Sequence, residues 1–482
     1  MSMHWFGPKA PSFGQTSVFQ SRYLVNWNFF RQAGFILDAG YAKFSDRAWK
    51  LNRADTDLLL LPPRYVDELR SLTSDVASPT AAHSFNLCGS QTNMNIILKN
   101  NLHFRTLQEK LTPNLARLSF PMQDELDLAM REELPICNDW TPIKPYHTIL
   151  RLVARVSARV FLGLPLCRSE EWLEISTEFT ENTFITLVVL RLFPQFLHRP
   201  IAWLLPSAWR ATNYIRKAKK LLVPEIKRRK ASANASSAKR ENSLNLLSWM
   251  MEIATPEESR PQDLAHLEVV ISLASIHTSQ MNAVHILYDL AERPEYIAIL
   301  RDEIAANIQE DGPFLRWTKS SFSKLKKLDS FMRESQRVNP PTLLSYHRVM
   351  LKSFKLQDGT LLPRKSHIAM PVNAIQNAIT PDADTFDPMR YYNLRQRENE
   401  GHLHQFATTE QNVLNFGHGK YACPGRFFAA LEIKSILVRL IMEYDWKLPD
   451  GEARPENLKA HEFIFPNQEG VLYLKRRTDA VE

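Results

Sequence analysis

Cys423 is the residue in this chain whose surroundings most clearly predict chemistry. It follows two glycine-containing turns at Gly417 and Gly419, and the apolar spacing over residues 426–444 predicts a buried helix directly after it. Pro424 suits the first position of that helix. Because the free amides and the positive dipole end of a helix favour a thiolate, we expect a lowered pKa for the Cys423 thiol. Such a thiolate is a good axial ligand for a haem iron.

Two other interpretations of this stretch need to be weighed. A lone cysteine after a turn is most often a buried structural residue. Gly417, Gly419 and Ala422 also fit a dinucleotide-binding G-x-G-x-x-A, which requires a strand before it and an acidic residue about 20 residues later at a strand end. Residues 405–415 are polar and not strand-like, and Asp445 falls at the end of a predicted helix. We therefore set the dinucleotide interpretation aside.

The loop resembles the haem-binding loop of the cytochrome P450 family, F-x-x-G-x-[RH]-x-C-x-G. Phe416, Gly419, Cys423 and Gly425 match that pattern. Tyr421 stands where the family usually has arginine or histidine to meet a haem propionate; tyrosine can donate a hydrogen bond but brings no positive charge. The resemblance implies that Cys423 ligates the iron of haem b.

The contacts of that loop with the haem follow from the same resemblance. It implies that Phe416, Gly417 and Tyr421 touch the porphyrin around the iron ligand. Arg348, in a strand-like run over residues 343–350, falls where the family places a propionate-binding cation, and a guanidinium fits a carboxylate in a bidentate way. His347 is the competing candidate for that contact.

A single long helix is predicted between Pro261 and Arg293, with a polar insertion in its apolar middle. The insertion resembles the family pattern [AG]-G-x-[DE]-T-[TS]. Its matching residues are Ala274, Thr278 and Ser279, whereas Ser275 and His277 replace the usual glycine and acid.

The Thr278 hydroxyl can bond the carbonyl four residues back, loosen the helix there and admit water. The resemblance implies that Thr278 holds the water that protonates iron-bound dioxygen. His277 is predicted to replace the family's acid as proton relay, because the pKa of histidine lies near neutrality. The alternative is an interior histidine with a satisfied ring.

Glu334 and Arg337 lie at i, i+3 in a helix predicted over residues 322–338, so they share one face and can pair. They resemble the family's E-x-x-R motif, and Arg390 lies in a segment similar to its F-x-P-x-R motif. The resemblance implies that these three residues form a buried network that fixes the loop before Cys423. A buried charge cluster requires complete pairing.

Composition predicts a mainly α fold with some β structure. The chain has 482 residues, 44% of them hydrophobic, and only 14 glycines, which disfavours an all-β protein. Strands are predicted over 58–61, 361–363 and 368–372, with a turn at Asp358-Gly359 and a helix over 65–72. The resemblance implies a helical bundle around the haem with small β-sheets. It divides the chain into an atypical N-terminal segment, 1–40, and a single cytochrome P450 domain, 41–482.

Charge and cysteine content limit the partners and the compartment. The net charge of +8 is diffuse, which disfavours nucleic-acid binding, and four scattered cysteines without C-x-x-C favour a reducing compartment. The first 44 residues contain no run of about 18 apolar residues and no signal-peptide layout, so no anchor is predicted there. Residues 231–238 predict a flexible loop.

Residues 184–205 are strongly apolar but are interrupted by Arg191 and by prolines, so they cannot span a bilayer. In the family this region covers the substrate channel. We expect either a peripheral membrane contact here or a plain core segment. The expected location is the cytosolic face of the endoplasmic reticulum.

The implied activity is monooxygenation of a lipophilic small molecule, with electrons that an NADPH-dependent reductase delivers. The I-H-T variant at residues 276–278 resembles fungal members that modify terpenoids and related secondary metabolites. One alternative is a reductase-independent isomerase or peroxide-rearranging enzyme of the same fold, in which the distal threonine tends to be lost. Another is a non-catalytic haem-binding protein.

Overall fold

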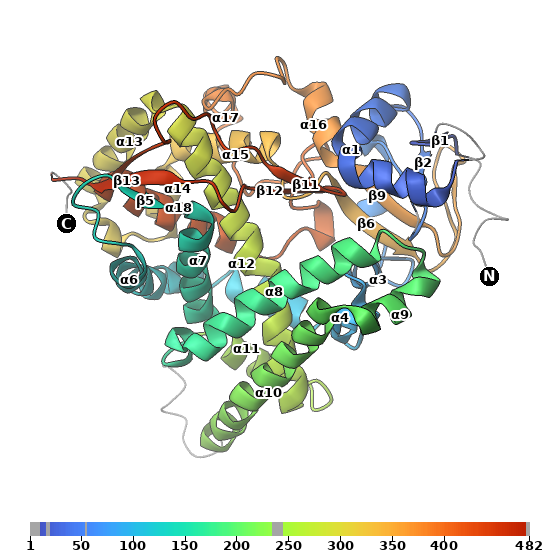
Figure 1. The fold of residues 1–482 in the computed structure, drawn as a ribbon, viewed down its shortest axis with the longest axis horizontal. Helices are drawn as coiled ribbons and strands as arrows, with labels where there is room; N and C mark the ends of the chain where they lie inside the picture. The colour runs from blue at the N-terminus through green and yellow to red at the C-terminus, as the bar shows by residue number, and fades with distance from the viewer. Residues whose placement is uncertain (1–9, 16–19, 54, 234–243, 479–482) are drawn as a thin grey trace.

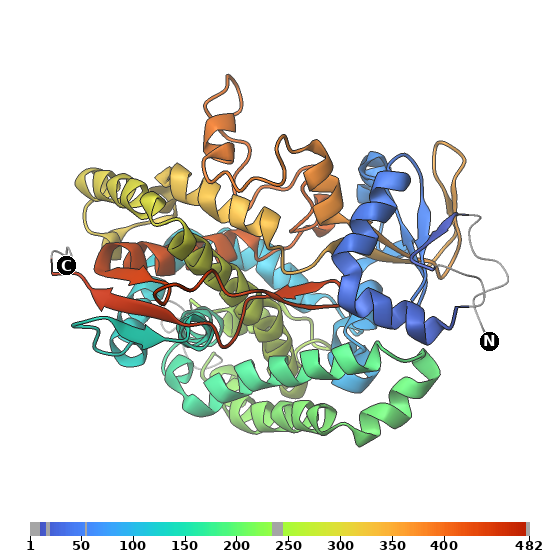
Figure 2. The same ribbon diagram turned by 45° about the horizontal axis from the view of Figure 1, so that its top comes forward.

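The structure is a computed structural model that describes residues 10–15, 20–53, 55–233 and 244–478. It is mainly helical; the strands of the largest sheet lie together at the right of Figures 1 and 2, whereas the three-stranded sheet near the C-terminus lies at the left. The longest described helix, α12 (Pro261–Glu292), crosses the middle of the molecule. The mainly α prediction with small sheets is therefore confirmed.

The helices fall into a long and a short group. The longer ones are α1 (Arg22–Lys43), α6 (Leu115–Glu133), α7 (Pro145–Phe161), α8 (Glu170–Leu190), α9 (Gln195–Leu204), α10 (Pro206–Ala233), α13 (Glu295–Asp311), α15 (Lys326–Val338) and α18 (Arg426–Glu443). The shorter ones are α2 (Val66–Arg70), α3 (Pro79–Asn86), α4 (Gly89–Thr92), α5 (Leu102–Thr106), α11 (Leu246–Ile253), α14 (Lys319–Lys324), α16 (Val372–Ile379) and α17 (Arg390–Leu394).

The largest sheet joins strands from both ends of the sequence. Its order is β1 (Ser12–Phe13), β2 (Trp49–Leu51), β3 (Leu58–Leu60), β9 (His367–Pro371), β6 (Leu344–Met350) and β4 (Ala77–Ser78). The smaller sheets are β10 (Tyr444–Lys447) with β13 (Leu472–Arg476) and β5 (Thr141–Ile143), β11 (Leu458–Ala460) with β12 (Phe463–Phe465), and β7 (Phe354–Lys355) with β8 (Leu361–Leu362).

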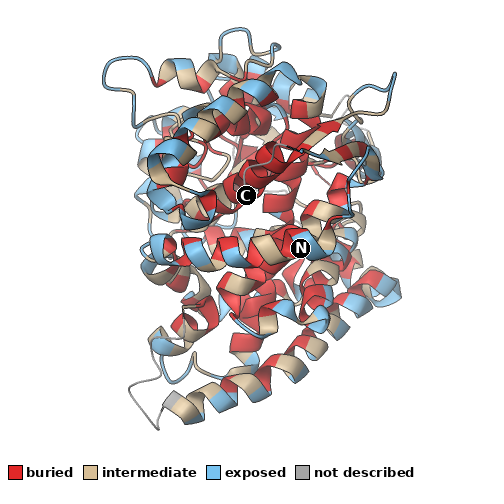
Figure 3. Ribbon diagram, turned by 90° about the vertical axis from the view of Figure 1, so that its left-hand side faces the viewer, coloured by how far each residue is buried: buried red, intermediate tan, exposed pale blue. Residues whose placement is uncertain are grey.

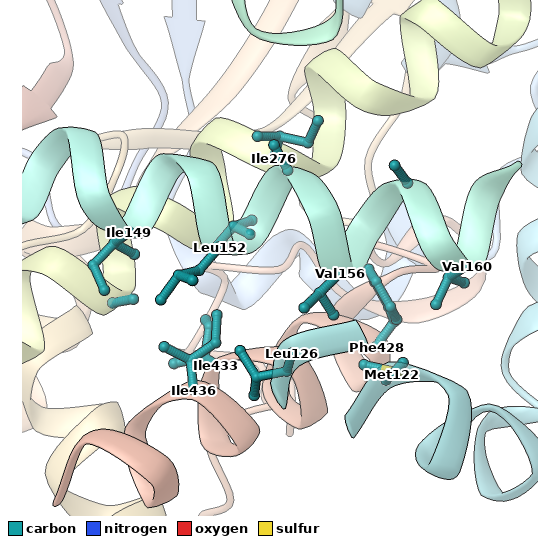
Figure 4. Close-up of a cluster of buried hydrophobic side chains, with 14 of the residues drawn as sticks. Met122, Leu126, Ile149, Leu152, Val156, Val160, Ile276, Phe428, Ile433 and Ile436 are labelled. Carbon is teal, nitrogen blue, oxygen red and sulfur yellow. The ribbon is translucent and has the colours of Figure 1, made fainter. Parts of the chain in front are cut away.

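The main core lies where α6, α7, α12 and α18 meet, and Figure 3 shows buried residues concentrated in the interior. Figure 4 shows how apolar side chains from these four helices interlock. The labelled ones are Met122, Leu126, Ile149, Leu152, Val156, Val160, Ile276, Phe428, Ile433 and Ile436. Full burial of such a side chain contributes roughly 1.5–3 kcal/mol, so this cluster holds α12 and α18 firmly against α7.

Several predicted elements differ from the structure. The helix predicted over 322–338 is two helices, because the Glu303 carboxylate accepts from the backbone N–H of Lys327 and Leu328 and starts α15 anew. Strand β8 pairs with β7 across the Asp358-Gly359 turn, whereas β9 pairs with β3 and β6 in the large sheet. Of the predicted loop at 231–238, residues 231–233 end α10 and the others lie outside the described residues.

Candidate functional site

The loop before α18 is held in one shape by its backbone. The Cys423 N–H donates to the Phe416 carbonyl at 2.7 Å. Gly417 and Gly419 have φ values of +67° and +73°, which other residues rarely adopt. A Cβ on Gly419 would lie 2.8 Å from Cβ of Arg70, so glycine is also required for the close approach to α2.

The helix that follows the loop begins at Arg426, with Gly425 as its N-cap. Pro424 therefore lies before the helix and is not its first residue as predicted. Desolvation raises the pKa of the Cys423 thiol above its usual value, and the N–H groups of Gly425 and Arg426 act in the opposite direction. The expectation of a lowered pKa is thus wrong for the protein without a metal, because burial outweighs the helix terminus. The N–H groups of Gly425 and Arg426 can still donate hydrogen bonds to the Cys423 sulfur when a metal binds it and neutralises its charge.

Helix α12 has an uncovered stretch in its middle. Ala274 and Thr278 are exposed and Ser275 is half-buried, although most residues on either side of them in the helix are buried. The Thr278 hydroxyl donates to the Ala274 carbonyl at 2.9 Å and to that of Ser275 at 3.2 Å. The predicted bond to the carbonyl four residues back is present, and α12 stays helical through it.

His277 lies on another side of α12. Its ring is buried, and Nε2 lies 3.2 Å from the Thr177 carbonyl of α8. Burial lowers the pKa of His277 to about 4, so the ring is neutral at physiological pH. The structure does not bring the His277 ring to the uncovered stretch beside Thr278, and its surroundings match those of an interior histidine with a satisfied ring.

Polar side chains of α12 and α18 approach each other at Ser279, the residue after Thr278. Ser157 of α7 donates to Oε1 of Glu432 at 2.7 Å. The Ser279 hydroxyl lies near enough to lower the pKa of Glu432 without meeting the geometry of a hydrogen bond. Burial is the larger effect and raises this pKa to about 8. Because Glu432 is nine residues after Cys423, this contact brings the uncovered side of α12 near the α18 end that carries the cysteine loop.

A chain of amides links the uncovered stretch of α12 to the cysteine loop. Asn282 Nδ2 donates to the Thr278 carbonyl at 2.7 Å, and Asn282 Oδ1 accepts from Gln336 Nε2 at 3.0 Å. Gln336 Oε1 in turn accepts from Asn415, the residue before Phe416, at 3.2 Å. Sequence reasoning missed this chain and Glu432. Polar residues within apolar helices were the only signal that could have indicated them.

The structure brings Glu334, Arg337 and Arg390 together. Arg337 donates from Nη2 and Nε to the two carboxylate oxygens of Glu334 at 2.7 and 2.9 Å. Arg390 Nε lies 3.3 Å from Oε2 of Glu334, and the Asp387 N–H donates to Oε1 at 3.0 Å. Arg337 also donates to the carbonyl of Ala383 at 2.8 Å. This cluster therefore ties α15 to the segment that leads into α17.

Arg348 and Tyr421 are neighbours as well. The Arg348 guanidinium lies 5.5 Å from the Tyr421 ring centroid and 4.4 Å from that of Tyr346. It donates to the His347 carbonyl at 2.8 Å, and no carboxylate of the described residues acts on it. Burial lowers the pKa of Arg348, and Tyr346 and Tyr421 oppose this. A buried cation without an anion is costly, so this position suits an incoming carboxylate.

His347, the competing candidate, is buried with a pKa held well below its usual range by burial first and then by His367. A neutral ring binds a carboxylate less strongly than a guanidinium does. The placement thus favours Arg348 for that contact.

These residues fit a haem. Cys423 supplies a sulfur ligand of the kind that haem iron accepts, and Arg348 supplies a cation that lacks an anion. The uncovered stretch at Ala274 and Thr278 leaves a face of α12 without protein cover, as a flat cofactor with a small ligand requires. We find no group of at least three histidine, cysteine, aspartate or glutamate residues in the described part of the chain that could hold a metal by itself.

A buried charge cluster anchors the segment predicted to cover the substrate channel. Arg191, at the end of α8, pairs with Glu462 at 2.7 Å and lies 3.7 Å from Asp55. Arg53 completes the cluster, donating to Asp55 at 2.9 Å. Burial would raise the pKa of Glu462, but Arg191 and Arg53 outweigh it and hold that pKa below its usual range. Arg191, which interrupts the apolar run of residues 184–205, therefore attaches this segment to the rest of the protein.

Comparison with known proteins gives a consistent result. Residues 93–474 match the family model described as cytochrome P450. The chain is 44% identical over 475 residues to the cytochrome P450 monooxygenase AN1598 of Emericella nidulans, covering 98% of this chain and 88% of that protein. It is 43% identical to the cytochrome P450 monooxygenase olcJ of Penicillium canescens, covering 98% and 89%. It is 36% identical to the ent-kaurene oxidase of Gibberella intermedia, covering 98% and 88%.

Proposed function

Because this chain belongs to the cytochrome P450 family, we propose that it is a haem-thiolate monooxygenase that oxidises a lipophilic small molecule. The observation that carries the proposal is the uncovered Thr278, whose hydroxyl lies in the middle of a mostly buried helix. A hydroxyl in that position can hold a water molecule where a proton is needed. When bound, the haem supplies the iron that binds and activates dioxygen.

The residues around the loop would hold that cofactor. Cys423 would ligate the iron, with the N–H groups of Gly425 and Arg426 stabilising the sulfur. Arg348 would pair with a propionate, and Tyr421 beside it would donate a hydrogen bond. Phe416 and Gly417 would touch the porphyrin around the ligand. Electrons would come from NADPH through a separate reductase.

On the opposite side, the residues of α12 would manage protons and substrate. Thr278 would hold water at its hydroxyl, whose single proton is directed at the carbonyls of Ala274 and Ser275, so that its lone pairs are free to accept. Ala274 would leave room for the substrate, since its side chain is a single methyl group. Glu334, Arg337 and Arg390 would keep the segments around the loop in register.

We propose that the substrate is a terpenoid or a related fungal secondary metabolite. One similar protein is named ent-kaurene oxidase, and this supports a lipophilic polycyclic substrate class. A screen of terpenoid scaffolds for binding-induced shifts of the haem spectrum tests the class. Shifts confined to small polar compounds would contradict it.

We further propose a peripheral membrane contact within residues 184–205, at the cytosolic face of the endoplasmic reticulum. Phe196, Trp203 and Leu204 of α9 are 78%, 69% and 71% exposed, and such a helix can lie in the membrane interface. Among the described helices none combines the length and the apolar character that crossing a bilayer requires. Vesicle flotation tests this: Phe196→Asp with Leu204→Asp should reduce binding, whereas Ile136→Asp, which alters an exposed residue before β5, should not.

The activity itself is tested by reconstitution with an NADPH-dependent reductase and dioxygen. We expect NADPH consumption coupled to an oxygenated product, and loss of both in Cys423→Ala. Conversion of a substrate or peroxide without NADPH would instead indicate a reductase-independent enzyme. Haem binding without turnover of any scaffold would indicate a non-catalytic protein.

A further inference from the structure

Helix α12 carries a line of polar side chains along one face. Glu268, Ser272, Ser275 and Ser279 are spaced i, i+4, i+7 and i+11, which keeps them on one side of an α-helix. Neighbours at such spacing have Cβ atoms about 5–6 Å apart, a gap that one water molecule can bridge. The line runs through the buried part of the helix and includes the half-buried Ser275.

Three members of this line have no protein partner. Both carboxyl oxygens of Glu268 and the hydroxyls of Ser272 and Ser279 are buried without a hydrogen bond to any described residue. Other buried hydroxyls bond the preceding turn, as Ser435 does to the Leu431 carbonyl at 2.8 Å. Each unsatisfied buried polar group costs about 1–3 kcal/mol. A buried water molecule makes about three hydrogen bonds, so bound water can satisfy the unpartnered groups of this line.

The line begins at Glu268, near polar groups of α10 that lie closer to the surface, and then passes the uncovered stretch of α12. At one end Arg229 of α10 acts electrostatically on Glu268, and Arg229 pairs at 2.7 Å with the half-buried Glu225. In the middle, Ser275 reaches the uncovered stretch, and its carbonyl accepts from the Thr278 hydroxyl. This order places Thr278 beside the line.

At the other end of the line, Ser279 lies beside Glu432, which accepts from Ser157 of α7. The two carboxyl groups therefore stand at opposite ends of a row of hydroxyls. Sequence patterns gave no indication of either carboxyl.

We propose that this face of α12 is a hydrated proton path, in which Glu268, Ser272 and Ser275 pass protons through bound water to the position where Thr278 works. Protons enter from solvent at the α10 end. This inference rests on the proposed monooxygenase function and adds the route by which its protons arrive. The relay residues act through water, and only Thr278 would touch the reacting atoms.

The charge states of the end groups agree with this path. Burial raises the pKa of Glu268 well above its usual value, and Arg229 is the charged group that opposes it. Burial raises the pKa of Glu432 to about 8, and the hydroxyls of Ser157 and Ser279 oppose it. Glu432 is therefore largely protonated at neutral pH and can donate as well as accept, and burial shifts the pKa of Glu268 in the same direction.

The test follows the Glu268 proton by infrared spectroscopy of the haem-loaded protein. The carbonyl stretch of protonated Glu268 is the band lost in Glu268→Gln, or shifted in Glu268→Asp if the first variant does not fold. After transfer into D2O, we expect rapid exchange in the wild type and at least about tenfold slower exchange in Ser272→Ala. The matched control, Ser435→Ala, removes a buried hydroxyl that already has a partner and should exchange as the wild type does.

The path would be overturned if the Glu268 proton exchanged as fast in Ser272→Ala as in the Ser435→Ala control. It would also be overturned if the Glu268 carboxyl were ionised at pH 7. A second measurement separates this failure from failure of the proposed function. In the reconstituted enzyme, Ser272→Ala should lower product formed per NADPH several-fold with an unchanged KM, and Ser272→Thr should restore it. If exchange depends on Ser272 but no scaffold is oxygenated, the proposed function fails and the hydrated line stands.

Discussion

Gln336 donates a hydrogen bond to the side chain of Asn282 at 3.0 Å, and this contact joins α15 to α12 in the core. The same glutamine accepts from Asn415, so one side chain of α15 touches both the helix that carries Thr278 and the loop that carries Cys423. The two sides of the proposed haem site are therefore connected by side-chain amides as well as by apolar packing.

Replacing Gln336 with leucine should destabilise the protein. The substitution keeps the volume but leaves Oδ1 of the buried Asn282 unsatisfied, at a cost of about 1–3 kcal/mol. It also removes the partner of Nδ2 of Asn415, which is half-buried and can bond to water instead. Urea denaturation measures the loss. The control is Gln396→Leu, which alters an exposed glutamine shortly after α17 and should change the denaturation midpoint little. Equal midpoints for the two variants would show that the amide chain does not support the site.

Glu334→Ala should abolish haem incorporation and not merely slow turnover. It would leave Arg337 buried without its carboxylate, and removing one partner of a buried pair costs about 3–5 kcal/mol. The measurement is the haem content of the purified protein. Arg228→Ala breaks a surface pair between the exposed Arg228 and the half-buried Glu225, which is worth about 0–1 kcal/mol, and the variant should load haem normally. A soluble Glu334→Ala protein with full haem content would refute this role.

Thr278→Val should separate NADPH consumption from product formation. Valine keeps the branched shape but lacks the hydroxyl that would hold water, and a positioned proton donor contributes roughly 10²–10⁴-fold to a rate. We expect oxygenated product to fall far more than NADPH consumption, with peroxide formed instead. Thr278→Ser keeps the hydroxyl and should retain most of the coupling. Unchanged coupling in Thr278→Val would assign the proton step to another group.

The stability of Glu432→Gln relative to the wild type should depend on pH. The pKa of Glu432 is about 8 in the folded protein and about 4.5 in a solvated carboxyl, so the folded state binds this proton more tightly. The stabilisation from the neutral carboxyl is therefore complete below pH 4.5 and is lost as pH rises towards 8. Buried histidines such as His277 titrate alike in both proteins and cancel in the difference.

Chemical denaturation between pH 5 and 8 measures that difference, a range bracketed by the two pKa values. We expect the wild type to lose unfolding free energy relative to Glu432→Gln as the pH rises. A constant difference over the range would mean that the carboxyl is solvated in the folded protein.

Local patterns were sufficient for much of the fold. Helical periodicity with flanking prolines predicted residues 261–293 as one helix, and the structure has Pro261–Glu292. The Glu334–Arg337 pair followed from its i, i+3 spacing. The family and the mainly α fold are confirmed by the comparisons.

The features of the site that could not be predicted are those that depend on how the helices pack against one another. His277 and Thr278 are adjacent in sequence, but one residue turns an α-helix by about 100°, so their side chains meet different neighbours. Likewise the closeness of Ser279 to Glu432 requires knowledge of how α12 packs on α18. The same limit applies to Arg191, which sequence reasoning treated as an interruption and which the structure pairs with Glu462.

The most direct test of the account is the absorption spectrum of the reduced, carbon monoxide-bound protein. We predict the long-wavelength Soret band of a thiolate-ligated haem in the wild type and in Cys137→Ala, which removes a different buried cysteine. The band should be absent in Cys423→Ala. A purified protein that binds no haem, or a Cys423→Ala variant with an unchanged spectrum, would contradict the account.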